Sequence, residues 1–249
     1  MSTLANDAIT AGSTTIVSNG DEIEAYGARP AGVEPVGSVV VIHHLPGYDG
    51  PTKEIVRRFA AEGFAAACPN LFHREAPGLP PAEASAIVRG MGGVPDPQVV
   101  ADVLGTIDYL KAQPTSNGRV GVIGYCSGGR HAFLAACELT FDAVVVCYGG
   151  YIVTPPAPDN PLKSTTLLDR TATLSCPMLG LFGEQDGNPS PADVAELQAA
   201  LDEHGKKADL HIAPEAGHAY FAVDRPNYRP AAANDGWAKV LAFFGEQLT

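Results

Sequence analysis

One cysteine of this sequence stands in a pattern that suits nucleophilic chemistry. Cys126 lies in the segment GYCSGG, between an apolar stretch and a stretch of helix-forming residues. A Gly-x-Cys-x-Gly turn between strand and helix is typical of a nucleophile elbow, in which the neighbours two residues either side meet and must both be small. Gly124 and Gly128 satisfy this condition for Cys126. Ser127 would have Tyr125 as such a neighbour, and its ring would clash, so the pattern favours the thiol.

A cysteine nucleophile needs a base and a group that orients the base. His218 lies in a turn before the last predicted helix, and Asp186 lies in the loop that follows the apolar strand 178–181. The order nucleophile, acid, histidine is that of α/β-hydrolases. Glu184 in the same loop is a competing acid, but its place at the strand end favours a structural role. The sequence therefore predicts Cys126, Asp186 and His218 as a catalytic triad.

The sequence resembles the dienelactone hydrolase family over nearly its whole length. The resemblance is carried by GYCSGG at the elbow, by AACPNLF from Ala66, by SNGRVG from Ser116 and by EAGH, which ends at His218. It implies an α/β-hydrolase fold and a cofactor-free hydrolase of small esters or lactones. It also implies that Cys126, Asp186 and His218 are the catalytic residues.

Two further features of the family concern the groups around the thiol. The resemblance implies an oxyanion hole formed by the backbone N–H groups of Leu45 and Ser127, and donors at a helix N-terminus suit a developing negative charge. The family's dienelactone-cleaving members carry a glutamate where this sequence has His44. A histidine would not oppose a thiolate, so we expect His44 to act as an auxiliary group that lets Cys126 ionise more readily at rest. Those members also place a substrate-binding arginine shortly after the triad histidine, whereas here none occurs before Arg225.

Composition excludes several classes of partner. The chain has 249 residues, with 16 lysines and arginines against 28 aspartates and glutamates, a formal net charge of −12. This charge repels nucleic acid and anionic membranes. The sequence has no apolar run long enough for a membrane span and no linker-like segment. We therefore expect a single domain over residues 1–249, a cytoplasmic location and a small-molecule ester or lactone substrate; the oligomeric state is not predicted.

Cysteines and histidines could also indicate disulfides or metal sites. The five cysteines are odd in number and mostly lie in apolar runs, which does not suit a disulfide framework. Adjacent strand residues point to opposite faces, so His43 and His44 could not readily hold one ion, and no metal site is predicted. Three cysteines are expected in the core: Cys68, Cys137 and Cys147. Four histidines are expected to be structural or solvated: His73, His131, His204 and His211.

The hydrophobic pattern predicts a mostly parallel sheet with helices on both faces. A hairpin around Asn19-Gly20 comes first, followed by short apolar runs that alternate with helical patterns. Residues 74–96 and 149–174 are rich in proline and glycine, so we expect them to be irregular and to shape the substrate pocket. Helices are predicted near residues 52–62, 97–113, 127–139, 191–203 and 230–247.

Three charged residues near predicted helices have simpler explanations than catalysis. Arg130, four residues after the nucleophile, is expected to pair with a carboxylate without touching substrate. Asp96 and Asp102 are expected to be helix-start charges that favour the helix dipole.

Two other functions remain open from the sequence. A protein of this fold could bind a small ligand without catalysis, and turnover of an activated ester would distinguish the two. Cys126 could instead serve a thiol redox protein, because the environment that ionises a thiol also favours its oxidation. The lack of a nearby resolving cysteine weakens that alternative, and peroxide consumption without ester turnover would support it.

Overall fold

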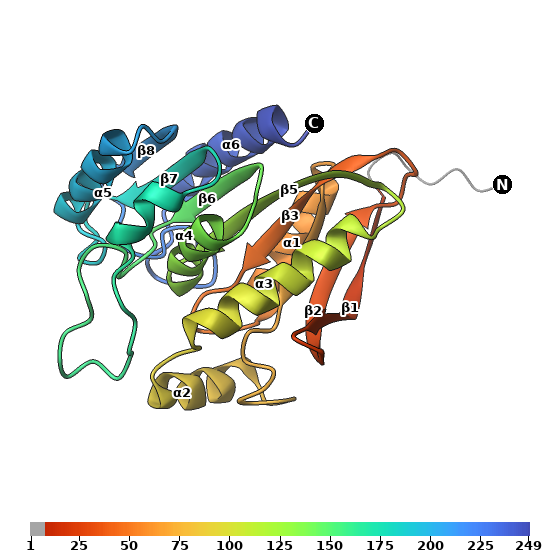
Figure 1. The fold of residues 1–249 in the computed structure, drawn as a ribbon, viewed down its shortest axis with the longest axis horizontal. Coiled ribbons are helices and arrows are strands. Elements are labelled where there is room, and N and C mark those ends of the chain that lie inside the picture. Colours follow the sequence, from red (N-terminus) through yellow and green to blue (C-terminus); the bar gives the residue numbers. More distant parts are fainter. Residues whose placement is uncertain (1–7) are drawn as a thin grey trace.

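The computed structural model describes residues 8–249 and contains one eight-stranded sheet (Figure 1). The strand order is β1-β2-β4-β3-β5-β6-β7-β8. Within residues 8–249 only the pairs β1–β2 and β2–β4 are antiparallel, so the predicted mostly parallel sheet is confirmed. The strands are β1 (Ile9–Ser18), β2 (Asp21–Pro30), β3 (Val36–Ile42), β4 (Ala65–Pro69), β5 (Ser116–Tyr125), β6 (Ala143–Cys147), β7 (Met178–Gly183) and β8 (Ala208–Ala213).

Helices cover both faces of the sheet, as predicted. Buried residues of α3, α4 and α5 belong to the apolar core on one face, and those of α1 and α6 belong to the core on the other (Figure 1). Burial on both faces explains why the central strands are almost wholly apolar. No helix among residues 8–249 combines the length and hydrophobicity needed to cross a bilayer. The bounds are α1 (Gly50–Ala61), α3 (Asp96–Lys111), α4 (Ser127–Glu138), α5 (Pro191–Glu203) and α6 (Pro230–Gln247).

The expectation that residues 74–96 are irregular is wrong for their middle part. Helix α2 (Pro81–Met91) begins with a proline in its first turn, where the missing N–H costs nothing. It ends at Gly92, whose left-handed φ of 103° closes the helix. Proline and glycine thus mark the helix ends here. The segment 149–174 is irregular apart from the 3₁₀ turn η1 (Leu168–Thr173).

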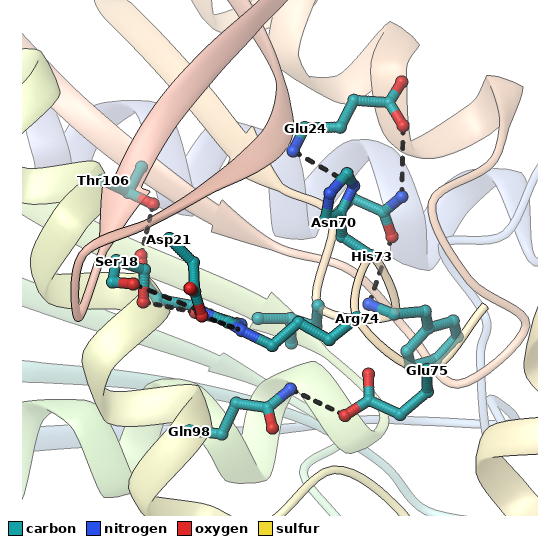
Figure 2. A network of polar contacts seen from close by, with 12 residues as sticks. Ser18, Asp21, Glu24, Asn70, His73, Arg74, Glu75, Gln98 and Thr106 are labelled. Carbon is teal, nitrogen blue, oxygen red and sulfur yellow. Dashed lines mark hydrogen bonds and ion pairs between the residues drawn. The ribbon is translucent and has the colours of Figure 1, made fainter. Parts of the chain in front are cut away.

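A buried ion pair ties the β1–β2 hairpin to α3 and to the loop after β4. Asp102 is fully buried, and its carboxylate accepts bonds from Ser18 Oγ at 2.6 Å and Arg74 Nη1 at 2.9 Å. Arg74 also bonds Asp21 at the hairpin turn, at 3.1 Å (Figure 2). The expectation that Asp102 is a helix-start charge is therefore wrong, because it lies in the second turn of α3 and faces inward.

Replacing Arg74 with methionine is expected to lower the free energy of unfolding by about 3 kcal/mol, because it strips a buried carboxylate of its cationic partner. Urea unfolding followed by circular dichroism measures this. Arg57→Met is the matched control, since the partner of Arg57, Glu54, has a largely exposed side chain; that pair should contribute less than about 1 kcal/mol. Equal losses in the two variants would contradict the importance of the buried pair.

The sheet also brings the predicted functional loops together. Strands β3, β5, β7 and β8 run parallel, so the loops that follow their carboxyl ends lie at the same edge of the sheet. These loops carry Leu45, Cys126, Asp186 and His218, respectively.

Candidate active site

Cys126 occupies a strained turn between β5 and α4. Its φ and ψ are 57° and −119°, which non-glycine residues adopt only where the surrounding structure enforces them. A Cβ atom at Gly124 would lie 1.9 Å from the carbonyl oxygen of Gly128, and one at Gly128 would lie 2.3 Å from that of Ile42. Both flanking positions therefore require glycine, as the sequence pattern predicts for an elbow.

The structure brings His218 and Asp186 together. Nδ1 of His218 lies 2.8 Å from Oδ2 of Asp186, and the Asp186 carboxylate is almost fully buried after β7. Its other oxygen accepts the backbone N–H of Asn188 at 2.9 Å, which fixes the carboxylate. Glu184 is exposed and instead accepts the backbone N–H of Glu215 at 2.9 Å. Of the two acids, Asp186 is the one that contacts His218.

The charge of His218 depends on both of its neighbours. Burial alone would lower its pKa, but the bonds to Asp186 and to the sulfur of Cys126 outweigh burial and raise the pKa to about 10. His218 is therefore an imidazolium at neutral pH. A positive charge beside a cysteine sulfur stabilises a thiolate, so the arrangement suits a thiolate–imidazolium pair.

The histidine titration should report this pairing directly. In the intact protein the ring carbon proton of His218, followed by NMR, is expected to titrate near pH 10, with the ring charged below that value. Cys126→Ala removes one of the two groups that favour the charge, so the midpoint should move downward. The signal of the exposed His204 serves as an internal control and should be the same in both proteins. An unchanged His218 midpoint would show that the sulfur does not act on the ring.

The two predicted oxyanion donors lie near Cys126. Leu45 and Ser127 both line the cavity that contains Cys126 and His218. Ser127 is the first residue of α4, so its N–H lies at the positive end of the helix dipole. Within residues 8–249, no backbone carbonyl accepts a bond from either N–H group. These two donors are therefore available to a substrate oxygen.

His43 and His44 point in different directions, as expected for adjacent residues. His43 is buried in the wall of the Cys126 cavity, where its Nδ1 bonds the carbonyl of His44 at 2.8 Å and its Nε2 accepts the N–H of Leu71 at 3.2 Å. Burial lowers the pKa of His43 to about 4, so it is neutral. It therefore fixes the loop after β3 to the segment after β4.

His44 does not line the cavity that contains Cys126. Its Nε2 lies 2.7 Å from Oδ2 of Asp49, which also caps α1 through the N–H of Thr52. The ring contributes to a separate cavity between α1 and the segment after His218. The structure thus gives His44 a partner in the loop, and its predicted influence on Cys126 has no support in this geometry.

The cavity around Cys126 has a volume of about 360 Å³, which suits a small organic molecule. Val88 and Val94 contribute from the segment 74–96, and Tyr151 and Leu162 contribute from the segment 149–174. The prediction that these two excursions shape the pocket is confirmed. Among residues 8–249, no three His, Cys, Asp or Glu side chains are grouped so that they could hold a metal ion.

Three basic residues of the cavity were not assigned to it from the sequence. Arg130 bonds both carboxylate oxygens of Asp96, at 2.7 and 2.9 Å, so it has the expected carboxylate partner but also lines the cavity. Asp96 is thus an ion-pair partner as well as a residue at the start of α3. Arg89 and His131 line the cavity too, whereas Arg225 does not. The sequence did contain one indication for His131. It follows Ser127 by one helical turn, so the two residues share a face of α4, and a residue on that face can line the same cavity.

Comparison with known proteins agrees with this geometry. The sequence pattern of the Dienelactone hydrolase family matches residues 23–248. The chain belongs to this family. The mostly parallel sheet and the arrangement of its loops are accordingly those of the α/β-hydrolase fold, and the protein is a hydrolase.

Individual relatives are similar over almost the whole chain. A provisionally named carboxymethylenebutenolidase of Escherichia coli strain K12 is 34% identical over 245 residues, which cover 96% of this chain and 88% of the relative. One of Methylorubrum extorquens is 33% identical over 97% of this chain and 84% of the relative. The crystal structure of a provisionally named dienelactone hydrolase of Klebsiella pneumoniae superposes with a TM-score of 0.85 at 31% identity and covers 96% of this chain and 99% of that one.

Proposed function

We propose that this family member hydrolyses small carboxylic esters or lactones through a thioester on Cys126, with His218 as general acid and base and Asp186 as its orienting partner. The observation that carries the proposal is the position of His218, bonded to the buried Asp186 at 2.8 Å and acted on by the sulfur at the elbow. An imidazole fixed between a carboxylate and a nucleophile is the arrangement that acyl transfer requires.

Acylation begins with attack of the Cys126 thiolate on the carbonyl carbon of the substrate. A carbon–sulfur bond forms, and the negative charge that develops on the carbonyl oxygen is stabilised by the N–H groups of Leu45 and Ser127. The bond to the leaving oxygen then breaks, and the His218 imidazolium donates its proton to that oxygen. The product of this half-reaction is an alcohol, or a tethered hydroxyl group when the substrate is a lactone.

Deacylation reverses the role of His218. Now neutral, the ring takes a proton from a water molecule as its oxygen attacks the thioester carbon. The carbon–sulfur bond breaks, the carboxylic acid leaves, and the thiolate–imidazolium pair is restored. Asp186 keeps the ring oriented in both steps.

The cavity and the relatives together favour small substrates with an acidic group. A volume of about 360 Å³ leaves room for a compact ester or lactone. The exposed Arg89 places a positive charge in the cavity lining, which suits a substrate that carries a carboxylate. The names of the relatives likewise point to a lactone with a carboxylate side group.

Trapping the acyl-enzyme tests the proposal. The protein is mixed with members of a panel of activated esters and small lactones, quenched in acid within the first turnover and digested for mass spectrometry. We expect an acyl mass increment on the peptide with Cys126 and release of acid with turnover. Binding without any turnover would instead favour the ligand-binding alternative, and peroxide consumption without ester turnover would favour the redox alternative.

A further inference from the structure

His131 is a polar residue in the cavity for which the proposed mechanism has no role. It lies on α4, one turn after Ser127, and its partly exposed ring lines the cavity. Its Nδ1 is buried and has no hydrogen-bond partner among residues 8–249. Other polar side chains that line the cavity have partners: Nη1 of Arg130 bonds Asp96, and both nitrogens of His43 are bonded, although Nε of Arg130 is also buried without a partner among residues 8–249.

The ring of His131 is neutral at physiological pH. Its pKa is lowered to about 3, mainly by burial. The positive charge of Arg130 also lowers the pKa, and this effect is larger than the opposite effect of Asp96. His131 therefore cannot act as a cation toward a substrate. It can act as a neutral hydrogen-bonding group.

The position of the single ring proton follows from the surroundings of the two nitrogens. A proton on Nδ1 would be a buried donor without an acceptor, which is a costly arrangement. Nε2 is not among the buried atoms that lack a partner, so a proton on Nε2 can reach the cavity that the residue lines. His131 thus presents an N–H donor to a cavity whose lining includes the apolar residues Val88 and Leu71.

The reaction geometry determines which part of a substrate lies at this donor. The leaving oxygen must lie beside His218, because that ring donates its proton. His218 packs edge-on against Tyr148. The ring of Tyr148 belongs to the core on one face of the sheet, and α4 packs on the opposite face. A substrate carbonyl held by Ser127 with its leaving group toward His218 therefore extends its acyl chain toward His131.

We infer that His131 is a specificity-determining residue, which donates Nε2–H to an oxygen of the acyl chain and so selects esters or lactones with a hydroxyl, oxo or ether oxygen on that chain. The inference rests on the proposed ester hydrolysis. A plain alkyl chain would leave the N–H donor without an acceptor, because the surrounding cavity wall is apolar. The loss of one neutral hydrogen bond corresponds to a kcat/KM about tenfold lower for the alkyl ester than for the ester with a chain oxygen.

The test compares two p-nitrophenyl esters of equal chain length, the butanoate and the 3-hydroxybutanoate. The ratio of their kcat/KM values is measured in the intact protein, in His131→Phe, which fills the site without a donor, and in His131→Gln, which retains an N–H donor. His204→Phe, at an exposed position, is the control. We expect His131→Phe to lower the preference for the hydroxy ester about tenfold and His131→Gln to recover part of it, whereas His204→Phe should keep the ratio of the intact protein.

A second measurement does not depend on turnover or on the folding of a variant. In the intact protein, the ¹⁵N resonances of His131 should show a neutral ring protonated at Nε2. Adding 3-hydroxybutanamide should shift Nε2, and butanamide should leave it nearly unchanged.

The outcomes separate this inference from the proposed function. An unchanged ester ratio in His131→Phe, or equal responses of Nε2 to the two amides, would overturn the role of His131 and leave the triad untouched. Failure of the intact protein to turn over either ester would contradict the proposed hydrolysis. The amide titration would still decide whether His131 recognises the acyl-chain oxygen.

Discussion

Replacing Cys126 with alanine is expected to lower kcat/KM for p-nitrophenyl acetate by about 10⁴-fold or more, because no other group at the elbow can form the acyl-enzyme. Cys126→Ser should retain a small fraction of the activity. It keeps the strained turn and the oxyanion donors but offers a hydroxyl that His218 must deprotonate during attack. Release of p-nitrophenol, corrected for spontaneous hydrolysis, measures both effects.

Cys137→Ala is the matched control for this experiment. Cys137 is a buried thiol on the same helix, α4, but it does not line the cavity. The control should therefore keep its rate. Iodoacetamide provides a second measurement, since it should inactivate the intact protein and the control through Cys126. Full activity in Cys126→Ala would remove Cys126 as the nucleophile.

The parts of the site that the sequence predicts best are those set by local geometry and chain order. The elbow needs a small residue two positions before and two positions after its central residue. Gly124 and Gly128 meet this requirement, so a segment of five residues is enough to recognise the turn. The acid and the histidine were predictable because loops after successive parallel strands must meet at one edge of the sheet. Local pattern and topology together therefore sufficed to bring Asp186 to His218.

The features that the sequence did not predict depend on contacts between distant segments. Nothing near Asp102 in the sequence indicates its partners Ser18 and Arg74, which lie on other elements. The direction of His44 is likewise set by Asp49, whose role as the cap of α1 fixes the carboxylate beside the ring. In the absence of a structure, family position alone placed His44 near the thiol.

The sequence did not indicate that His131 lines the cavity, for a related reason. A lone histidine on an apolar helix face is usually a structural residue whose nitrogens are bonded. Here the buried Nδ1 lacks a partner among residues 8–249, and the residue lines a cavity whose wall also includes residues of α2 and of the loop after β6. Unpaired polar atoms in a cavity are thus a signal that only the three-dimensional structure provides.

Replacing His218 with alanine is expected to lower kcat/KM for the same ester by about 10²–10⁴-fold, the usual contribution of a general acid and base. The variant loses the proton donor for the leaving oxygen, the base for the attacking water and the positive charge beside the sulfur. Because p-nitrophenolate leaves without a proton, an alkyl ester should suffer a larger loss. Comparing the two esters separates the acid role from the others.

The orienting acid is tested by two isosteric changes in one loop. Asp186→Asn removes the charge that holds the His218 imidazolium and allows the amide to favour the wrong ring tautomer, so the rate should fall by orders of magnitude, as it does for an orienting aspartate in general. Glu184→Gln alters only an exposed side chain that accepts the N–H of Glu215, and its rate should stay close to that of the intact protein. If Glu184→Gln were the more damaging change, the acid would be Glu184, and the 2.8 Å contact between His218 and Asp186 would have no catalytic meaning.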